Sequence, residues 1–206
     1  MIPGYQEETI MTKLSVRRTV RAVAVTAAVL TAGLTLAACG GDKGSDTAAP
    51  ATPSGWKKLA GPTVSLAYPP GLTEQSKAER GRLNDAAALR SEGDRPTVKV
   101  SIQSGFASAS TGDDAASVGR ALLMATTEVK GTKDADIEGA KDAKRIDFTY
   151  TGTGVPQSPP KGAKVDGVVI TGVDSGGKIY SVRIDAQEGK LSDADRTKIV
   201  DSIQVK

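Results

Sequence analysis

The sequence contains no histidine and a single cysteine, and only 3% of its 206 residues are aromatic. Without histidine, Ser-His and Cys-His catalysis is excluded, together with the commonest general base and the commonest zinc ligand. A lone cysteine cannot form a disulfide within the chain, so packing alone must stabilise the fold. These absences favour a binding or accessory protein over an enzyme, and they predict neither a cofactor nor a metal site.

An excess of charge of one sign is also missing. The whole chain carries 27 basic and 24 acidic side chains, a formal net charge of +3. Residues 1–38 hold four of the basic and two of the acidic side chains, which leaves 23 and 22 in the remainder, a net charge of +1. Such a chain has no field to attract nucleic acid, so a nucleic-acid partner is not expected.

The N-terminus has the pattern of an export signal. Residues 1–10 carry two acids and no base, which makes Met11 the better start. A positive region follows, and Ala22–Ala38 is then uncharged. That run is short for a membrane-spanning helix of about 20 apolar residues, and threonines dilute it. The sequence therefore predicts a signal peptide over residues 1–38, with the general secretory and twin-arginine routes both open. The basic residues of the positive region are Lys13, Arg17, Arg18 and Arg21.

The end of this signal, Leu36-Ala37-Ala38-Cys39, resembles the lipobox of bacterial lipoproteins. The resemblance implies that the Cys39 thiol receives a diacylglyceryl group and that cleavage before Cys39 exposes its amine. Ala37 and Ala38 then supply the small side chains that the peptidase admits beside the cut. Because two acyl chains anchor a protein stably where one does not, we expect Cys39 to hold the protein on the extracytoplasmic face of the cell membrane.

Behind the cysteine, residues 39–54 are rich in Gly, Ser, Thr and Pro and contain no large apolar side chain. This composition predicts a flexible tether. Residues 55–206 are long enough for one domain of ordinary size.

Within that domain, alternating apolar residues predict strands at 64–68, 86–91, 97–106, 146–150, 165–173 and 179–184. Val98, Val100 and Ile102 face one way in such a strand, and Lys99, Ser101 and Gln103 face the other way. In the same manner Tyr180, Val182 and Ile184 alternate with Ser181, Arg183 and Asp185. Pro69-Pro70-Gly71 and Asp174–Gly177 are turn sequences.

Two helices are predicted from capping patterns. The first begins after Thr111, carries Val118, Leu122, Ala125 and Val129 as an apolar stripe against a sheet, and ends at Gly131. The second follows Ser192, with Asp195 at the reciprocal position, and closes the chain. Its expected buried residues are Ala194, Ile199, Val200 and Ile203.

The order of strands, helix, strands, helix predicts an α+β fold, in which an antiparallel sheet is flanked by two helices. Several segments resemble the PsbP/Mog1-like fold and, among lipidated proteins, the LpqN-type lipoproteins. The resemblance implies a non-enzymatic accessory or binding module with a partner protein or small ligand in the cell envelope. The segments are Trp56–Leu59, Tyr68–Leu72, the central helix, the hairpin at 165–185 and Ile199–Ile203.

Five local patterns invite a chemical interpretation, and each has a plainer one that we favour. Two S-x-x-K matches lie in a linker and in a turn, without the helix that such a nucleophile needs. A Gly-rich segment lacks a following helix to hold phosphate. Three acids on an extended segment lack the bent loop of a calcium site. A basic cluster could meet anionic lipid but suits a solvated turn. Two aromatics could line a groove but suit the core edge. The S-x-x-K matches are Ser54–Lys57 and Ser175–Lys178, and the Gly-rich segment is Gly152–Pro156. The three acids are Asp134, Asp136 and Glu138, the basic cluster is Lys141, Lys144 and Arg145, and the two aromatics are Trp56 and Tyr68.

Three functions remain open at this point. A non-enzymatic binding module is favoured. A carrier of apolar envelope molecules would need a cavity of several hundred Å³ lined by Leu, Ile and Val. A hydrolase or transferase using carboxylates or a Ser-Lys pair would need an enclosed pocket where such side chains converge.

The anchor is directly testable. Cys39→Ser removes the thiol that accepts the lipid, so we expect the chain to be unprocessed or released from the membrane. Membrane fractionation with a gel-shift assay of processing measures both effects. Normal processing together with unchanged membrane association would refute the assignment.

Overall fold

The computed structural model describes residues 52–123 and 125–206. The predicted signal peptide, the lipobox, Cys39 and most of the tether lie outside this part of the chain and remain predictions. No helix in the described part is both long and apolar enough to cross a membrane.

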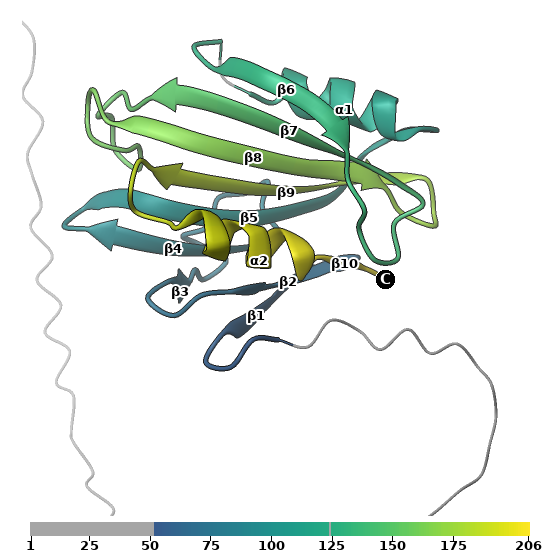
Figure 1. Ribbon diagram of the computed structural model, residues 1–206, viewed down its shortest axis with the longest axis horizontal. Helices are drawn as coiled ribbons and strands as arrows, with labels where there is room; N and C mark the ends of the chain where they lie inside the picture. The colour runs from purple at the N-terminus through teal and green to yellow at the C-terminus, as the bar shows by residue number, and fades with distance from the viewer. Residues whose placement is uncertain (1–51, 124) are drawn as a thin grey trace, which may run out of the picture. The chain divides into compact units, whose positions relative to one another are not determined.

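The main element is an antiparallel sheet of seven strands, with consecutive strands β6 to β9 forming a meander (Figure 1). The central pair of strands, β5 and β9, joins segments that are far apart in the sequence. The β8–β9 turn is fixed by the Asp174 carboxylate, which accepts hydrogen bonds from the backbone N–H of Gly176 and Lys178 at 2.9 and 2.8 Å. In sheet order the strands are β3 (Thr73–Glu74), β4 (Ala86–Glu92), β5 (Arg95–Ser108), β9 (Lys178–Gln187), β8 (Lys164–Val173), β7 (Asp142–Thr151) and β6 (Glu128–Asp134).

A second, smaller sheet joins the two ends of the domain. It contains β1 (Lys57–Ala60), β2 (Val64–Tyr68) and β10 (Gln204–Val205), with β2 in the middle. Helix α2 (Asp193–Asp201) leads into β10, and the Ser202 hydroxyl accepts a hydrogen bond of 2.8 Å from the Ala67 backbone N–H. The α+β class with antiparallel sheets and two helices is confirmed, although the strands divide between two sheets.

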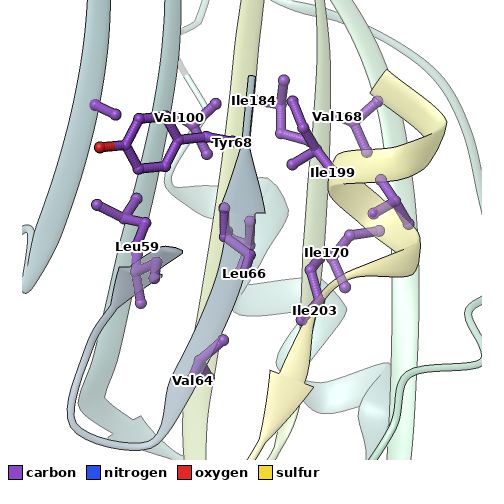
Figure 2. Close-up of a cluster of buried hydrophobic side chains, with 14 of the residues drawn as sticks. Leu59, Val64, Leu66, Tyr68, Val100, Val168, Ile170, Ile184, Ile199 and Ile203 are labelled. Atoms are coloured by element: carbon purple, nitrogen blue, oxygen red, sulfur yellow. The ribbon is translucent and has the colours of Figure 1, made fainter. Parts of the chain in front are cut away.

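The main core lies between the small sheet with α2 and one face of the large sheet. Figure 2 shows Ile199 of α2, and Ile203 just beyond the end of that helix, beside Ile170, Val168 and Ile184 of the large sheet. All five side chains are buried. Leu59, Leu66 and Tyr68 extend the same core from β1 and β2 toward Val100.

Helix α2 follows the prediction at its start and departs from it at its end. The Ser192 hydroxyl accepts a hydrogen bond of 3.0 Å from the Asp195 backbone N–H, as the capping pattern predicted. The prediction was wrong on Ala194, which is exposed, and on the chain ending with the helix. The last residues instead form β10, where the Val205 N–H donates to the Glu138 carbonyl at 2.8 Å.

Helix α1 (Gly112–Ala121) covers part of the other face of the large sheet, over β7 and β8. It begins as predicted, since the Thr111 hydroxyl accepts a hydrogen bond from the Asp114 N–H. The carboxylate of Asp142 in β7 is a second acceptor at this end of the helix, where the Gly112 N–H donates to it at 2.6 Å. The residues of α1 that are buried against the sheet are small: Gly112, Ala115, Ala116 and Gly119.

The predicted extent and apolar stripe of this helix were wrong. The helix ends before Leu122, and Val129 lies in β6. Small residues explain the orientation, because they let the helix backbone approach the sheet closely; a methyl group on Gly119 would lie 3.3 Å from Ile146 and from Thr171. Leu122 is left 47% exposed and Val129 41% exposed. The β-branched residues after the helix favour the strand that follows.

One substitution pair tests whether the small sheet is part of the cooperative core. Leu66→Ala removes a side chain that is 1% exposed, so the free energy of unfolding should fall by about 2–5 kcal/mol. Leu83→Ala is the same change at a side chain that is 73% exposed, and it should alter stability by no more than about 0.5 kcal/mol. Urea denaturation of the full chain measures both, and equal effects would contradict this packing.

Candidate binding groove

Helix α1 covers only part of its side of the large sheet. Over β5 and β9 the sheet is left largely uncovered, and a groove of about 330 Å³ lies there. Strands β5 and β9 form its floor. The end of α1 and the segments around residues 83–84 and 157–159 form its walls. The groove is partly open to solvent, so this face does not present the enclosed pocket expected of an envelope hydrolase.

The floor is polar because of strand register. Lys99 lies opposite Asp185, and Ser101 lies opposite Arg183. Residues two apart on a strand share a face, so the polar positions predicted separately in the two strands meet on one surface when β5 pairs with β9. Gln103 opposite Ser181 continues the same surface toward α1.

Arg183 is held in place by two neighbours, Asp185 and Phe148. Its guanidinium makes a two-pronged contact with the Asp185 carboxylate, with N–O distances of 2.8–3.1 Å. It also lies 5.0 Å from the ring centre of Phe148, an attractive cation–π distance. Burial lowers the pKa of Arg183, but the Asp185 charge and hydrogen bond outweigh it and leave the pKa raised. Arg183 is thus a fixed positive group whose charge Asp185 already balances.

A glycine makes this arrangement possible. Gly167 of β8 lies between Asp185 and Phe148 in the cross-strand row, and a methyl group there would overlap the Phe148 ring. The ring therefore lies across β8 and provides the surface on which Arg183 rests. Tyr150 stacks near Phe148 at 6.3 Å between ring centres, and its pKa is raised by burial and by the Asp185 charge.

Lys99 is different, since it has no hydrogen-bond or ion-pair partner within residues 52–123 and 125–206. Burial lowers its pKa, and Asp185 only partly offsets that effect because Arg183 opposes it. The hydroxyls of Ser101 and Ser181 line the groove as well, and within the same residues neither has a hydrogen-bond partner. One ammonium group and two hydroxyls therefore reach the groove with unused donors.

The walls are mainly apolar. Leu122 and Leu123 at the end of α1 line one side, and Leu83 lines another. Pro159 belongs to a loop that is tied to the rest of the domain by Arg95, whose Nη1 donates to the carbonyls of Gly154 and Val155 at 2.7 and 2.8 Å. Leu122 was predicted to pack against the sheet, but it borders the groove instead, which is why it is partly exposed.

The residues that the sequence singled out lie elsewhere. Tyr68 is in the core, and Trp56 packs at its edge under Lys198, whose Nζ is 5.8 Å from the ring centre. Lys178 contacts Ser108 rather than Ser175. Ser54 and Lys57 are both exposed near the start of the domain.

The acidic and basic clusters also resolve into ordinary contacts. Lys144 Nζ lies 2.6 Å from Asp134 and 3.3 Å from Asp113, and these hydrogen bonds raise its pKa. Arg145 contacts Asp147 at 2.8 Å on the other face of β7. Within the described residues, no three His, Cys, Asp or Glu side chains are grouped as a metal site requires.

The groove residues Lys99, Arg183 and Asp185 were missed as a site. Their polar faces were visible in the sequence, but only the β5–β9 pairing brings them together. The small-residue spacing Gly112, Ala115/Ala116, Gly119 was the sequence signal that could have placed α1 over β7 and β8.

Comparison with known proteins gives similarity of fold alone. No family model and no curated protein matches the sequence. A crystal structure from Bacteroides thetaiotaomicron is 15% identical, with a TM-score of 0.45, and the match covers 74% of this chain and 49% of that one. The chain thus spans about half the length of the Bacteroides protein. The solution structure of cyanobacterial PsbP (CyanoP) from Synechocystis is 12% identical, with a TM-score of 0.47, and the match covers 81% and 98%. PsbP is the family named in the sequence resemblance; the LpqN-type resemblance remains a prediction.

Gly167 can be tested against a matched glycine. Gly167→Ala forces the Phe148 ring away from β8, so we expect a loss of about 1–3 kcal/mol in the free energy of unfolding. Gly131 of β6 has open space around it and ordinary backbone angles, so Gly131→Ala should be neutral or stabilise by up to about 1 kcal/mol. Thermal and urea denaturation measure both, and an unaffected Gly167→Ala would contradict the placement of Phe148.

Proposed function

We propose that this protein is a lipid-anchored, extracytoplasmic binding module that performs no chemistry of its own and holds its ligand in the groove over β5 and β9. The observation that carries the proposal is the convergence of unused donors on the groove floor, at Lys99, Ser101 and Ser181. Lys99 is half-buried and the two serines are buried. Polar groups withdrawn from water without partners are costly for a fold, so their presence in a concave site favours a ligand.

The groove chemistry supports binding over catalysis. A carboxylate or an imidazole is not free to act as general base here, because the chain has no histidine and Asp185 is engaged by Arg183. The floor has two serines, yet within the part of the chain that the structure describes neither is hydrogen-bonded to Lys99 or to another basic side chain that could activate it. A hydrolase or transferase would need such a pair.

A carrier of wholly apolar molecules fits this site less well. Its cavity would be lined by Leu, Ile and Val, whereas the groove has such residues on its walls and charged or hydroxyl groups on its floor. A ligand with both an apolar and a polar part matches both surfaces. The cell-membrane location and an envelope ligand or partner protein rest on the lipidation of Cys39.

Native mass spectrometry tests this function. The full chain is extracted in mild detergent from membranes of the cells that make it, and we expect it to carry a small-molecule adduct. Ser101→Phe fills the centre of the groove floor and should abolish the adduct. Ser91→Phe is the matched control, since Ser91 is exposed on β4 outside the groove.

Thermal melting must first show that both variants are folded. An adduct that survives in folded Ser101→Phe, or a wild-type chain that carries none, would count against the groove as the ligand site.

A further inference from the structure

We propose that the groove is specific for a small monoanion, a carboxylate on an apolar body, whose carboxylate is bound by the Lys99 ammonium and the Ser101 hydroxyl while its apolar part packs against the leucines of the groove wall. This inference rests on the proposed function and names the ligand class.

The balance of charge in the groove points to a single negative charge. Lys99 and Arg183 contribute two positive charges and Asp185 one negative charge, so the floor has a net charge of +1. The Arg183–Asp185 contact is already formed with two nitrogens on two oxygens. Among the described residues that line the groove, Lys99 alone is left to pair with a ligand, and one ammonium matches one carboxylate better than a doubly charged phosphate.

The donors are placed on one surface. Lys99 and Ser101 are two residues apart on β5 and line the groove from the same face of the sheet. An ammonium offers three N–H donors and a serine hydroxyl one, and a carboxylate can accept all of them. A bound anion would also oppose the effect of burial, which lowers the pKa of Lys99, so binding and protonation of Lys99 strengthen each other.

The walls require an apolar partner for the remainder of the ligand. Leu83 is 73% exposed and Leu122 is 47% exposed although both line the groove, and Leu123 lines it as well. Covering this surface releases water from apolar side chains, which favours binding. A volume of about 330 Å³ is at the small end of ligand sites, which favours a compact molecule over a long-chain lipid.

Octanoate is a suitable probe because it combines one carboxylate with a short apolar chain. Isothermal titration uses the full chain in phosphatidylcholine nanodiscs, with empty nanodiscs as the blank. We expect octanoate to bind, and octanamide and acetate to bind at least about tenfold more weakly, because each lacks one of the two features.

Variants of Lys99 identify the contact. Lys99→Met keeps the length of the side chain without its charge, and it should weaken octanoate binding at least about tenfold. Lys99→Arg restores the charge and should bind within about threefold of wild type. Lys58→Met is the matched control on the small sheet, where Lys58 is exposed, and it should leave binding unchanged.

Three outcomes would overturn the inference: no octanoate binding, octanamide binding as tightly as octanoate, or full affinity in folded Lys99→Met. If the native adduct is nonetheless lost in Ser101→Phe, the groove is still the ligand site and only the ligand class is wrong. If the native adduct is retained in Ser101→Phe, the proposed function fails as well.

Discussion

The fold is governed by the need to cover two faces of a seven-stranded sheet with a limited supply of apolar side chains. One face is covered over its central strands, because the small sheet and α2 pack on it with Leu66, Ile199 and Ile203. On the other face, a ten-residue helix of small side chains covers mainly β7 and β8 and reaches just the start of β9, at Ile179. The strands β5 and β9 are otherwise left without a cover, so their outer residues are polar. The groove is thus what remains when the second layer is incomplete.

That open face is stabilised by a chain of contacts rather than by a core. Gly167 leaves room for Phe148, Phe148 supports Arg183, and Arg183 holds Asp185. Because Arg183 and Asp185 neutralise each other, the charge of Lys99 is not balanced by either of them. An unbalanced, half-buried charge lowers the stability of a fold, and natural proteins tolerate such a loss at functional sites.

Local features of the fold could be predicted from the sequence, and distant ones could not. The caps at Thr111 and Ser192 and the turn at Asp174 depend on residues within four positions, and the structure has all three. The predicted end of α1 was wrong because Leu122 fitted the spacing of a helical apolar stripe. The close approach at Gly119 decides which side of the helix faces the sheet, and the sequence spacing does not show it.

The strand β10 was missed because two residues carry no periodicity of their own. The groove was missed for a related reason. Lys99 and Arg183 each resemble the solvated side of a strand until the β5–β9 register places them together. The alternation of apolar and polar residues predicted which side chains share a face, whereas the sequence holds no comparable signal for which strands are neighbours.

The pairing of β10 with β2 has a consequence for the rate at which this protein folds. Val64 lies opposite Val205, so the small sheet requires contact between residues from opposite ends of the domain. Closing so long a loop costs entropy before any contact repays it, and chains rich in such pairings fold slowly. The small sheet cannot be completed until residues 204–205 are in place. Leu59 and Leu66 share one core with Ile199 and Ile203, so the cover over that core is completed in a late step of folding.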